Sequence, residues 1–351
     1  MRLPAALSTA LLVLGGAVLG ADQGSPTLYV FGDSPSDTGM LQRLTLGLLP
    51  PPPYWNGRFS SGPVWSEYLA SLLGYKLSSR AIAGATSDNQ MFSLGEAFGI
   101  NLPSTQDQIN TFRLTNLLYK TEPSREHDIA VLEVGSNDYL AAMGRLQQGE
   151  MSTDEFCSTL VSTVVGQLGQ LREMGFQNIM VTNMPAIQLT PMAQGGGRDT
   201  ARAMVAQYNQ LFAERTTAWA AQTPPGSGVF VVGDIGGFVE ATLGSTAIAG
   251  ALGIANTTSP CVAGLDTSSL GALMRSAASL DGDGTCDDPS THYFFDALHP
   301  GERVHRLFGY YSRELIEAAR ANATYSTSEA GVIALVEKYK LGTPVPKPVR
   351  T

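Results

Sequence analysis

Charged residues are scarce in this sequence, and basic residues are scarcer than acidic ones. Only 15% of the 351 residues are charged and 43% are hydrophobic, and 22 lysines and arginines stand against 31 aspartates and glutamates, a net charge of −9. A disordered chain has the opposite balance of apolar and charged residues. No basic run occurs, which excludes the surface that a nucleic-acid partner requires. The composition predicts a folded protein with one large α/β domain or two smaller ones.

Long apolar runs are missing after the N-terminus. Residues 5–19 are apolar apart from Ser8 and Thr9, follow Arg2 and end at the small residues Gly20 and Ala21. This pattern predicts a cleaved signal peptide, residues 1–20. A membrane-spanning helix needs about 20 apolar residues, so an uncleaved anchor is the less favoured alternative. We therefore expect a secreted, extracellular protein without stable membrane insertion.

Cysteine is rare, and the three cysteines that are present fit an oxidising compartment. Cys261 and Cys286 flank a segment rich in glycine, serine and aspartate, and are the expected disulfide. Closing a loop of that size stabilises a fold by about 3 kcal/mol. Cys157 is left over in a predicted helix, where a buried free thiol is the simplest interpretation. Sequons at Asn256 and Asn322 predict N-glycosylation.

Short apolar runs alternate with helical patterns, and no internal repeat is found. Four runs predict strands that are buried on both faces, at residues 27–33, 128–134, 178–182 and 229–232. Helical patterns cover residues 63–73, 104–119, 153–174, 198–221, 302–321 and 329–339. This alternation predicts a parallel sheet between helix layers. We expect one domain, 21–325, with an insertion at about 236–288 and a peripheral C-terminal tail, 326–351.

Polar residues follow the predicted strands, where open parallel sheets form their active sites. Ser34 ends the run Gly32-Asp33-Ser34 and is either an exposed nucleophile on a turn or a helix cap. Asn137 follows the second strand, either as a donor to an oxyanion or in an Asx turn or cap. Gly84 lies between alanines, where a backbone N–H can approach a ligand closely. Taken singly, these residues leave both alternatives open.

Histidine is limited to four residues, and their spacing does not fit a metal site. Asp296 stands three residues before His299, so its carboxylate can hold one ring nitrogen while the other takes a proton from serine. His127 lies in a charged run, His305 lies inside the last predicted helix, and His292 has no acidic residue three positions earlier. His299 is therefore the preferred general base.

Ser34, Gly84, Asn137 and His299 occur in the order that gives the SGNH hydrolase family its name. Residues 30–39 (VFGDSPSDTG), 56–60 (NGRFS) and 62–65 (GPVW) resemble the first block of its GDSL lipase/esterase branch. That branch includes plant-type GDSL esterases and fungal acetylesterases. The resemblance spans about residues 27–320 and implies a three-layer α/β/α, flavodoxin-like fold with a parallel central sheet. Two departures occur: Pro35 replaces a residue that is usually leucine, and Gly301 replaces a common threonine.

The resemblance also implies residue roles. Ser34 would attack the ester carbonyl, His299 would act as general base and then general acid, and Asp296 would orient His299. The N–H groups of Ser34 and Gly84 and the side-chain amide of Asn137 would form the oxyanion hole. Removing one such donor typically costs about 3 kcal/mol of transition-state stabilisation.

We therefore expect a secreted serine esterase that prefers short-chain acetyl esters of carbohydrates. The alternatives are a GDSL lipase or phospholipase acting on longer acyl chains, and a non-catalytic carbohydrate-binding protein on the same scaffold. No cofactor or metal is expected, and we expect a monomer. The acidic residues at 281–288 resemble a calcium loop, but His292 stands where an EF-hand has glutamate, so a surface loop is preferred.

Overall fold

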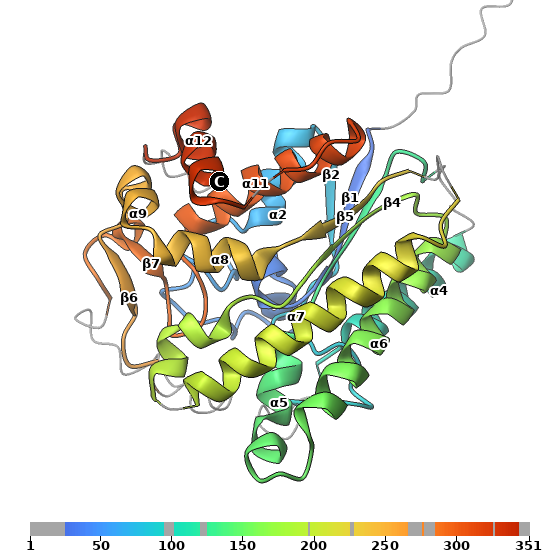
Figure 1. The fold of residues 1–351 in the computed structure, drawn as a ribbon, viewed down its shortest axis with the longest axis horizontal. Helices are drawn as coiled ribbons and strands as arrows, with labels where there is room; N and C mark the ends of the chain where they lie inside the picture. The colour runs from blue at the N-terminus through green and yellow to red at the C-terminus, as the bar shows by residue number, and fades with distance from the viewer. Residues whose placement is uncertain are drawn as a thin grey trace, which may run out of the picture.

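Five parallel strands form the centre of the molecule (Figure 1), in the order β2-β1-β3-β4-β5. The computed structural model describes residues 25–94, 102–119, 125–195, 197–224, 228–265, 276, 285–325 and 327–343. The strands are β1 (Thr27–Gly32), β2 (Lys76–Ser79), β3 (Ile129–Glu133), β4 (Asn178–Thr182) and β5 (Phe230–Gly233). This strand order is that of flavodoxin-like folds, so the predicted fold class is confirmed.

Helices cover both faces of the sheet, because its strands are apolar on both sides. Every residue of β3 and β4 is buried. On one face, Phe31 and Leu132 share a core cluster with four helices, and on the other, Val30 and Val131 share a second cluster with five helices. Figure 1 shows the two groups on opposite sides of the strands. The first group is α4 (Thr105–Tyr119), α5 (Ser136–Gln147), α6 (Thr153–Glu173) and α7 (Arg198–Ala220). The second is α2 (Trp65–Leu73), α8 (Ile235–Gly244), α9 (Thr246–Leu252), α11 (Glu302–Arg320) and α12 (Glu329–Tyr339).

The four predicted strands and six predicted helices are all present, with ends shifted by no more than two residues. The strand β2 was not predicted. It lies at the sheet edge, none of its residues is fully buried, and its sequence, KLSS, has no apolar run. The helix α5 was not predicted either, since it begins within the polar stretch that follows β3.

The segment 236–288, expected as an insertion, begins with most of α8 and with α9. Phe238 and Ile248 from these helices are buried in the second core cluster, so this part of the segment belongs to a helix layer. Two short strands, β6 (Asn256–Pro260) and β7 (His292–Phe294), then form a small parallel sheet. In the expected tail, Val332 of α12 packs into the same cluster.

No single helix among the described residues is long and apolar enough to cross a bilayer, and α8 and α9 are so only when taken together across a bend of 89°.

Candidate active site

Ser34 and His299 meet at the carboxyl end of the sheet. Ser34 follows β1 and begins a short 3-10 helix, η1 (Ser34–Ser36), whose cap residue is Asp33. His299 lies in the turn before α11. Its Nε2 atom is 2.7 Å from the Ser34 Oγ atom, although 265 positions separate the residues in sequence. The Ser34 hydroxyl therefore points at an imidazole and does not cap a helix.

Asp296 holds the other side of the imidazole. Its Oδ2 atom is 2.7 Å from Nδ1 of His299, and its Oδ1 atom accepts hydrogen bonds from the backbone N–H groups of Leu298 and His299, at 2.8 and 2.6 Å. Burial alone would raise the pKa of Asp296, but the charge of His299 and hydrogen bonds from His299 and Tyr54 outweigh it, so the pKa is lowered. A carboxylate placed in this way fixes the ring orientation and leaves Nε2 to accept a serine proton.

Tyr54 is a residue of this site that sequence reasoning did not assign. Its hydroxyl donates to Oδ2 of Asp296 at 2.5 Å. Burial and the charge of Asp296 raise the pKa of Tyr54, which keeps the phenol protonated as a donor. The Phe59 ring packs against the rings of Tyr54 and His299, and its centroid is 5.0 Å from each of theirs. In the sequence, the run PPPPYW at 50–55 is compatible with a polyproline platform, an aromatic wall beside the site or a rigid loop, and only its closeness to the NGRFS block connects it with the site.

The three expected oxyanion donors differ in their present hydrogen bonds. Among the described residues, the N–H groups of Ser34 and Gly84 have no acceptor. Gly84 has φ of +84°, and a Cβ atom there would lie 2.6 Å from Cδ1 of Leu102, so only glycine fits. The Asn137 amide instead donates to Oδ2 of Asp33 and to the Ala85 carbonyl, both at 3.0 Å. Two donors are therefore free, and the third is occupied.

Asp138 ties the loop that carries Gly84 to the start of α5. Both of its carboxylate oxygens accept from the Ser87 N–H at 3.0 Å, and one also accepts from the Ser87 hydroxyl at 2.6 Å. Burial, partly offset by these hydrogen bonds, raises the pKa of Asp138 to about 7. The adjacent residues Asn137 and Asp138 thus connect α5 to both neighbouring loops.

One hollow is lined by Ser34 and His299, and a second hollow adjoins the first. The first, of about 90 Å³, is otherwise lined mainly by apolar side chains, among them Phe238, Phe294 and Val304. The other, of about 470 Å³, includes Tyr139 and Met143, and shares part of its wall with the first. A hollow of about 680 Å³ lined by residues 193–194 and 197–200 is larger, but none of the residues above line it. We assign the substrate region by its chemistry rather than by volume.

The remaining predicted residues that the structure describes make no hydrogen bond with Ser34, Asp296 or His299, although Cys261 and Cys286 pack in the same core cluster as Tyr54 and Phe59. Cys261 and Cys286 form a disulfide, and Cys157 is a buried free thiol. His292 lies near the two bridged sulfur atoms, which the disulfide already uses. Asn322 is exposed and Asn256 half-buried, and their glycosylation stays a prediction. The predicted signal peptide, residues 1–20, and residues 281–284 of the acidic loop lie outside the described residues.

Comparisons with known proteins identify the family of this chain. Residues 28–311 match the model of the GDSL-like lipase/acylhydrolase family. The chain is 31% identical over 190 residues to a phosphatidylcholine-sterol acyltransferase of Aeromonas hydrophila, covering 52% of each chain. It is 24% identical to a thermolabile hemolysin of Vibrio parahaemolyticus, covering 85% of this chain and 65% of the relative.

A third relative is an acetylesterase of Hypocrea jecorina, with 30% identity over 188 residues, 49% of this chain and 53% of that protein. The matched part is thus between about half and two thirds of the length of these relatives. The family match covers most of the chain and includes Ser34, Gly84, Asn137, Asp296 and His299. This protein therefore belongs to the GDSL-like lipase/acylhydrolase family.

Proposed function

We propose that this protein is a carboxylic-ester hydrolase that works through an acyl-enzyme on Ser34. The observation that carries the proposal is the contact of Ser34 Oγ with His299 Nε2 at 2.7 Å, while Asp296 holds Nδ1 at 2.7 Å. A serine alone is a weak nucleophile, and an adjacent oriented base activates it.

The reaction proceeds in two halves. Ser34 Oγ attacks the ester carbonyl carbon as His299 takes its proton, and the carbonyl oxygen becomes an oxyanion that the Ser34 and Gly84 N–H groups stabilise. His299 then returns the proton to the alcohol oxygen as the C–O bond breaks. Water, deprotonated by His299, attacks the acyl-enzyme and releases the acid and free Ser34. The rate should fall at acidic pH, because a protonated imidazole cannot accept the serine proton.

The preferred substrates in this proposal are short-chain acetyl esters of carbohydrates. The apolar hollow of about 90 Å³ beside Ser34 supports a small acyl group, since sites for drug-sized ligands reach roughly 300–1,000 Å³. The similarity to a fungal acetylesterase adds support. The apolar N-terminus and the disulfide Cys261–Cys286 support a secreted enzyme.

A lipase or phospholipase acting on longer acyl chains is the second candidate. The hollow of about 470 Å³ favours it, because Tyr139, Leu140, Met143 and Met192 line it with apolar surface next to the site. The similarity to a phosphatidylcholine-sterol acyltransferase points the same way.

Initial rates on p-nitrophenyl esters of increasing acyl length test the proposal and separate the two substrates. Wild type is compared with Ser34→Ala and with Ser66→Ala, a matched control whose buried hydroxyl has no partner among the described residues. We expect rates that peak at acetate, vanish in Ser34→Ala and persist in Ser66→Ala. Acetylated sugars are then assayed for acetate release.

Other results have definite meanings. A peak at long acyl chains would retain Ser34 and favour lipids. Wild-type activity in Ser34→Ala would refute the mechanism. A wild-type protein without activity on any ester would favour the non-catalytic scaffold.

A further inference from the structure

Two buried carboxyl groups, Asp33 and Glu133, lie directly beneath Ser34. Asp33 is 1% exposed and Glu133 is 4% exposed, and both line the hollow next to the serine. Glu133 ends β3, opposite Gly32 of β1. A Cβ atom at Gly32 would lie 2.7 Å from the Glu133 carbonyl oxygen and 3.2 Å from Oε2, so the glycine makes room for this side chain.

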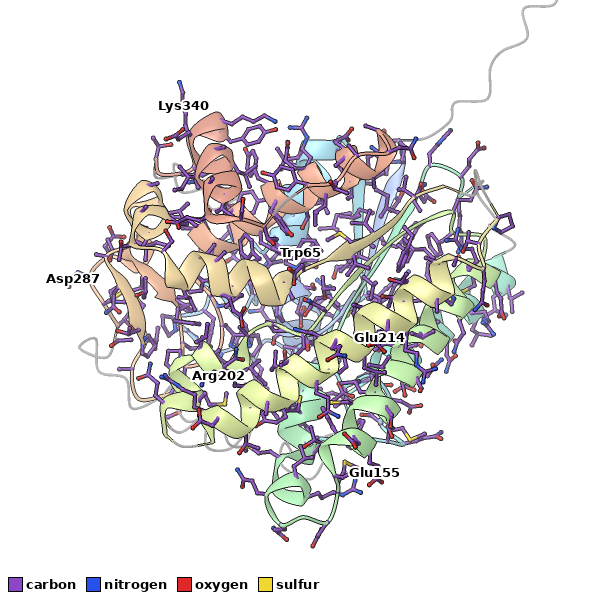
Figure 2. The ribbon with its side chains drawn as sticks, viewed as in Figure 1. Trp65, Glu155, Arg202, Glu214, Asp287 and Lys340 are labelled. Carbon is purple, nitrogen blue, oxygen red and sulfur yellow. A yellow bond between two sulfur atoms is a disulfide. The ribbon has the colours of Figure 1, made fainter. Side chains whose placement is uncertain are left out.

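A chain of hydrogen bonds runs through the pair from α2 to α5. The Trp65 indole N–H donates to Ser36 Oγ at 3.0 Å, and the Ser36 hydroxyl donates to Glu133 Oε2 at 2.9 Å. Trp65 is labelled near the middle of the molecule in Figure 2, and its side chain is buried. At the other end, Asn137 donates to Asp33 Oδ2 at 3.0 Å. Each hydrogen bond in this series has an N–H or O–H donor, whereas the contact that joins the two carboxyl groups has none unless one of them is protonated.

The contact between Asp33 and Glu133 requires a proton. The two carboxyl groups lie close enough to interact, and Oδ1 of Asp33 is buried with no described N–H or O–H group donating to it. Ionised carboxylates only accept hydrogen bonds, so one of the two must be protonated for the contact to be attractive. Two carboxyls that share a site titrate as a pair, with one proton held well above the usual pH range.

The surroundings place that proton on Asp33. Burial, the charges of Glu133 and Asp138, and the bond to Glu133 raise the pKa of Asp33 well above its usual value, although the Asn137 bond lowers it. Burial also raises the pKa of Glu133, but bonds from Ser36 and Asp33 and the charge of His299 oppose that rise. Glu133 also accepts from the Ser36 hydroxyl, whereas Oδ1 of Asp33 has no donor among the described residues, so Glu133 is the better-stabilised anion of the two.

We propose that Asp33 and Glu133 share one proton, and that this positioning pair limits how strongly Asp33 holds the Asn137 amide, which the oxyanion would use as a donor. The inference rests on the proposed esterase function. Asn137 gives one amide hydrogen to Asp33, and a neutral Asp33 accepts it through an ordinary hydrogen bond. An ionised Asp33 would hold the amide through a bond about twice as strong. It would also add a second negative charge next to the developing oxyanion.

The test compares kcat and KM from neutral to alkaline pH in Glu133→Gln, Asp33→Asn and the double variant. A glutamine amide can donate to an ionised Asp33, so Glu133→Gln should move the alkaline loss of activity to lower pH and reduce kcat by about tenfold or more at neutral pH. An asparagine at position 33 cannot ionise, so Asp33→Asn should abolish the loss of activity at alkaline pH. It should also lower kcat at neutral pH less than Glu133→Gln does. The double variant should recover most of the kcat that Glu133→Gln loses. Equal losses in both single variants, without movement of the alkaline limb, would overturn the proposal.

An infrared measurement makes the outcome independent of catalysis. The difference spectrum of wild type minus Asp33→Asn should show a protonated carboxylic acid band near neutral pH, because the contribution of Asp138, whose pKa is about 7, is common to both proteins and cancels. Thermal unfolding checks that both proteins are folded. A band unchanged in Asp33→Asn would refute the shared proton even if the enzyme is active. A band that is lost as expected, together with ester hydrolysis unaffected by Ser34→Ala, would instead refute the proposed function.

Discussion

Removing the Tyr54 hydroxyl should slow the enzyme without unfolding it. Tyr54→Phe deletes one of four donors to Asp296, the one that bonds Oδ2 at 2.5 Å, and leaves His299 Nδ1 and two backbone N–H groups in place. A hydrogen bond to a charged group contributes about 1.5–3 kcal/mol. If the transition state loses all of it, kcat/KM falls by roughly tenfold to a hundredfold.

The assay is kcat/KM on p-nitrophenyl acetate for wild type, Tyr54→Phe and Tyr208→Phe. Tyr208 is a matched control, because its buried hydroxyl has no hydrogen-bond partner among the described residues. Tyr208→Phe should therefore match wild type. A Tyr54→Phe rate within about twofold of wild type, below even the weakest charged hydrogen bond, would refute the reasoning. Equal losses in the two variants would refute it as well.

Acid unfolding offers a second measurement on the same variant. The lowered pKa of Asp296 stabilises the folded state above the unfolded pKa of about 3.9, and this stabilisation is lost as pH falls through the folded pKa. Tyr54→Phe removes one group that lowers this pKa. The variant should therefore unfold at a higher pH than wild type in an acid titration followed by circular dichroism.

Two further predictions concern stability. Asp138 has a pKa of about 7 in the folded protein, above the unperturbed aspartate value of about 3.9. The folded protein holds this proton more tightly than the unfolded chain, so the resulting stabilisation is complete below the unfolded pKa and is lost as the pH rises towards 7. Relative to Asp138→Asn, wild type should lose up to about 4 kcal/mol of unfolding free energy as the pH rises over that range, as measured by urea titrations. A difference in unfolding free energy between the two proteins that stays constant with pH would contradict this prediction. Replacing Cys261 and Cys286, 25 positions apart, by serine should lower the unfolding free energy by about 3 kcal/mol. A loss below about 1 kcal/mol would contradict the loop-entropy argument.

Local patterns in the sequence predict the parts of the fold that are buried on both sides. The strands β1, β3, β4 and β5 are short apolar runs, and burial requires that pattern wherever they lie. The sequence does not predict the edge strand β2, because Lys76 is exposed and Ser78 and Ser79 are only half-buried, so the strand has no apolar run. The helix α8 escapes because its glycines and threonine resemble a turn-rich loop, although Phe238 is buried in the core.

The candidate site likewise contains residues that the sequence indicates and residues that it does not. Ser34, Asn137 and His299 stand in short motifs whose order indicates a family. Tyr54 and Glu133 have no such motif. Tyr54 meets Asp296 across 242 positions of sequence, and Glu133 meets Ser36 across 97. Packing of distant segments fixes such contacts, and one sequence carries no local sign of them.

The distance of 265 positions between Ser34 and His299 has a consequence for biosynthesis. Ser34, Gly84 and Asn137 leave the ribosome early, and the central sheet is complete at Gly233, well before His299 is made. The turn that carries His299 is held between β7 and α11, so the base reaches Ser34 only after α11 has packed on the sheet. A nascent chain in which α11 has not yet packed therefore carries Ser34 without the base that the proposed mechanism requires.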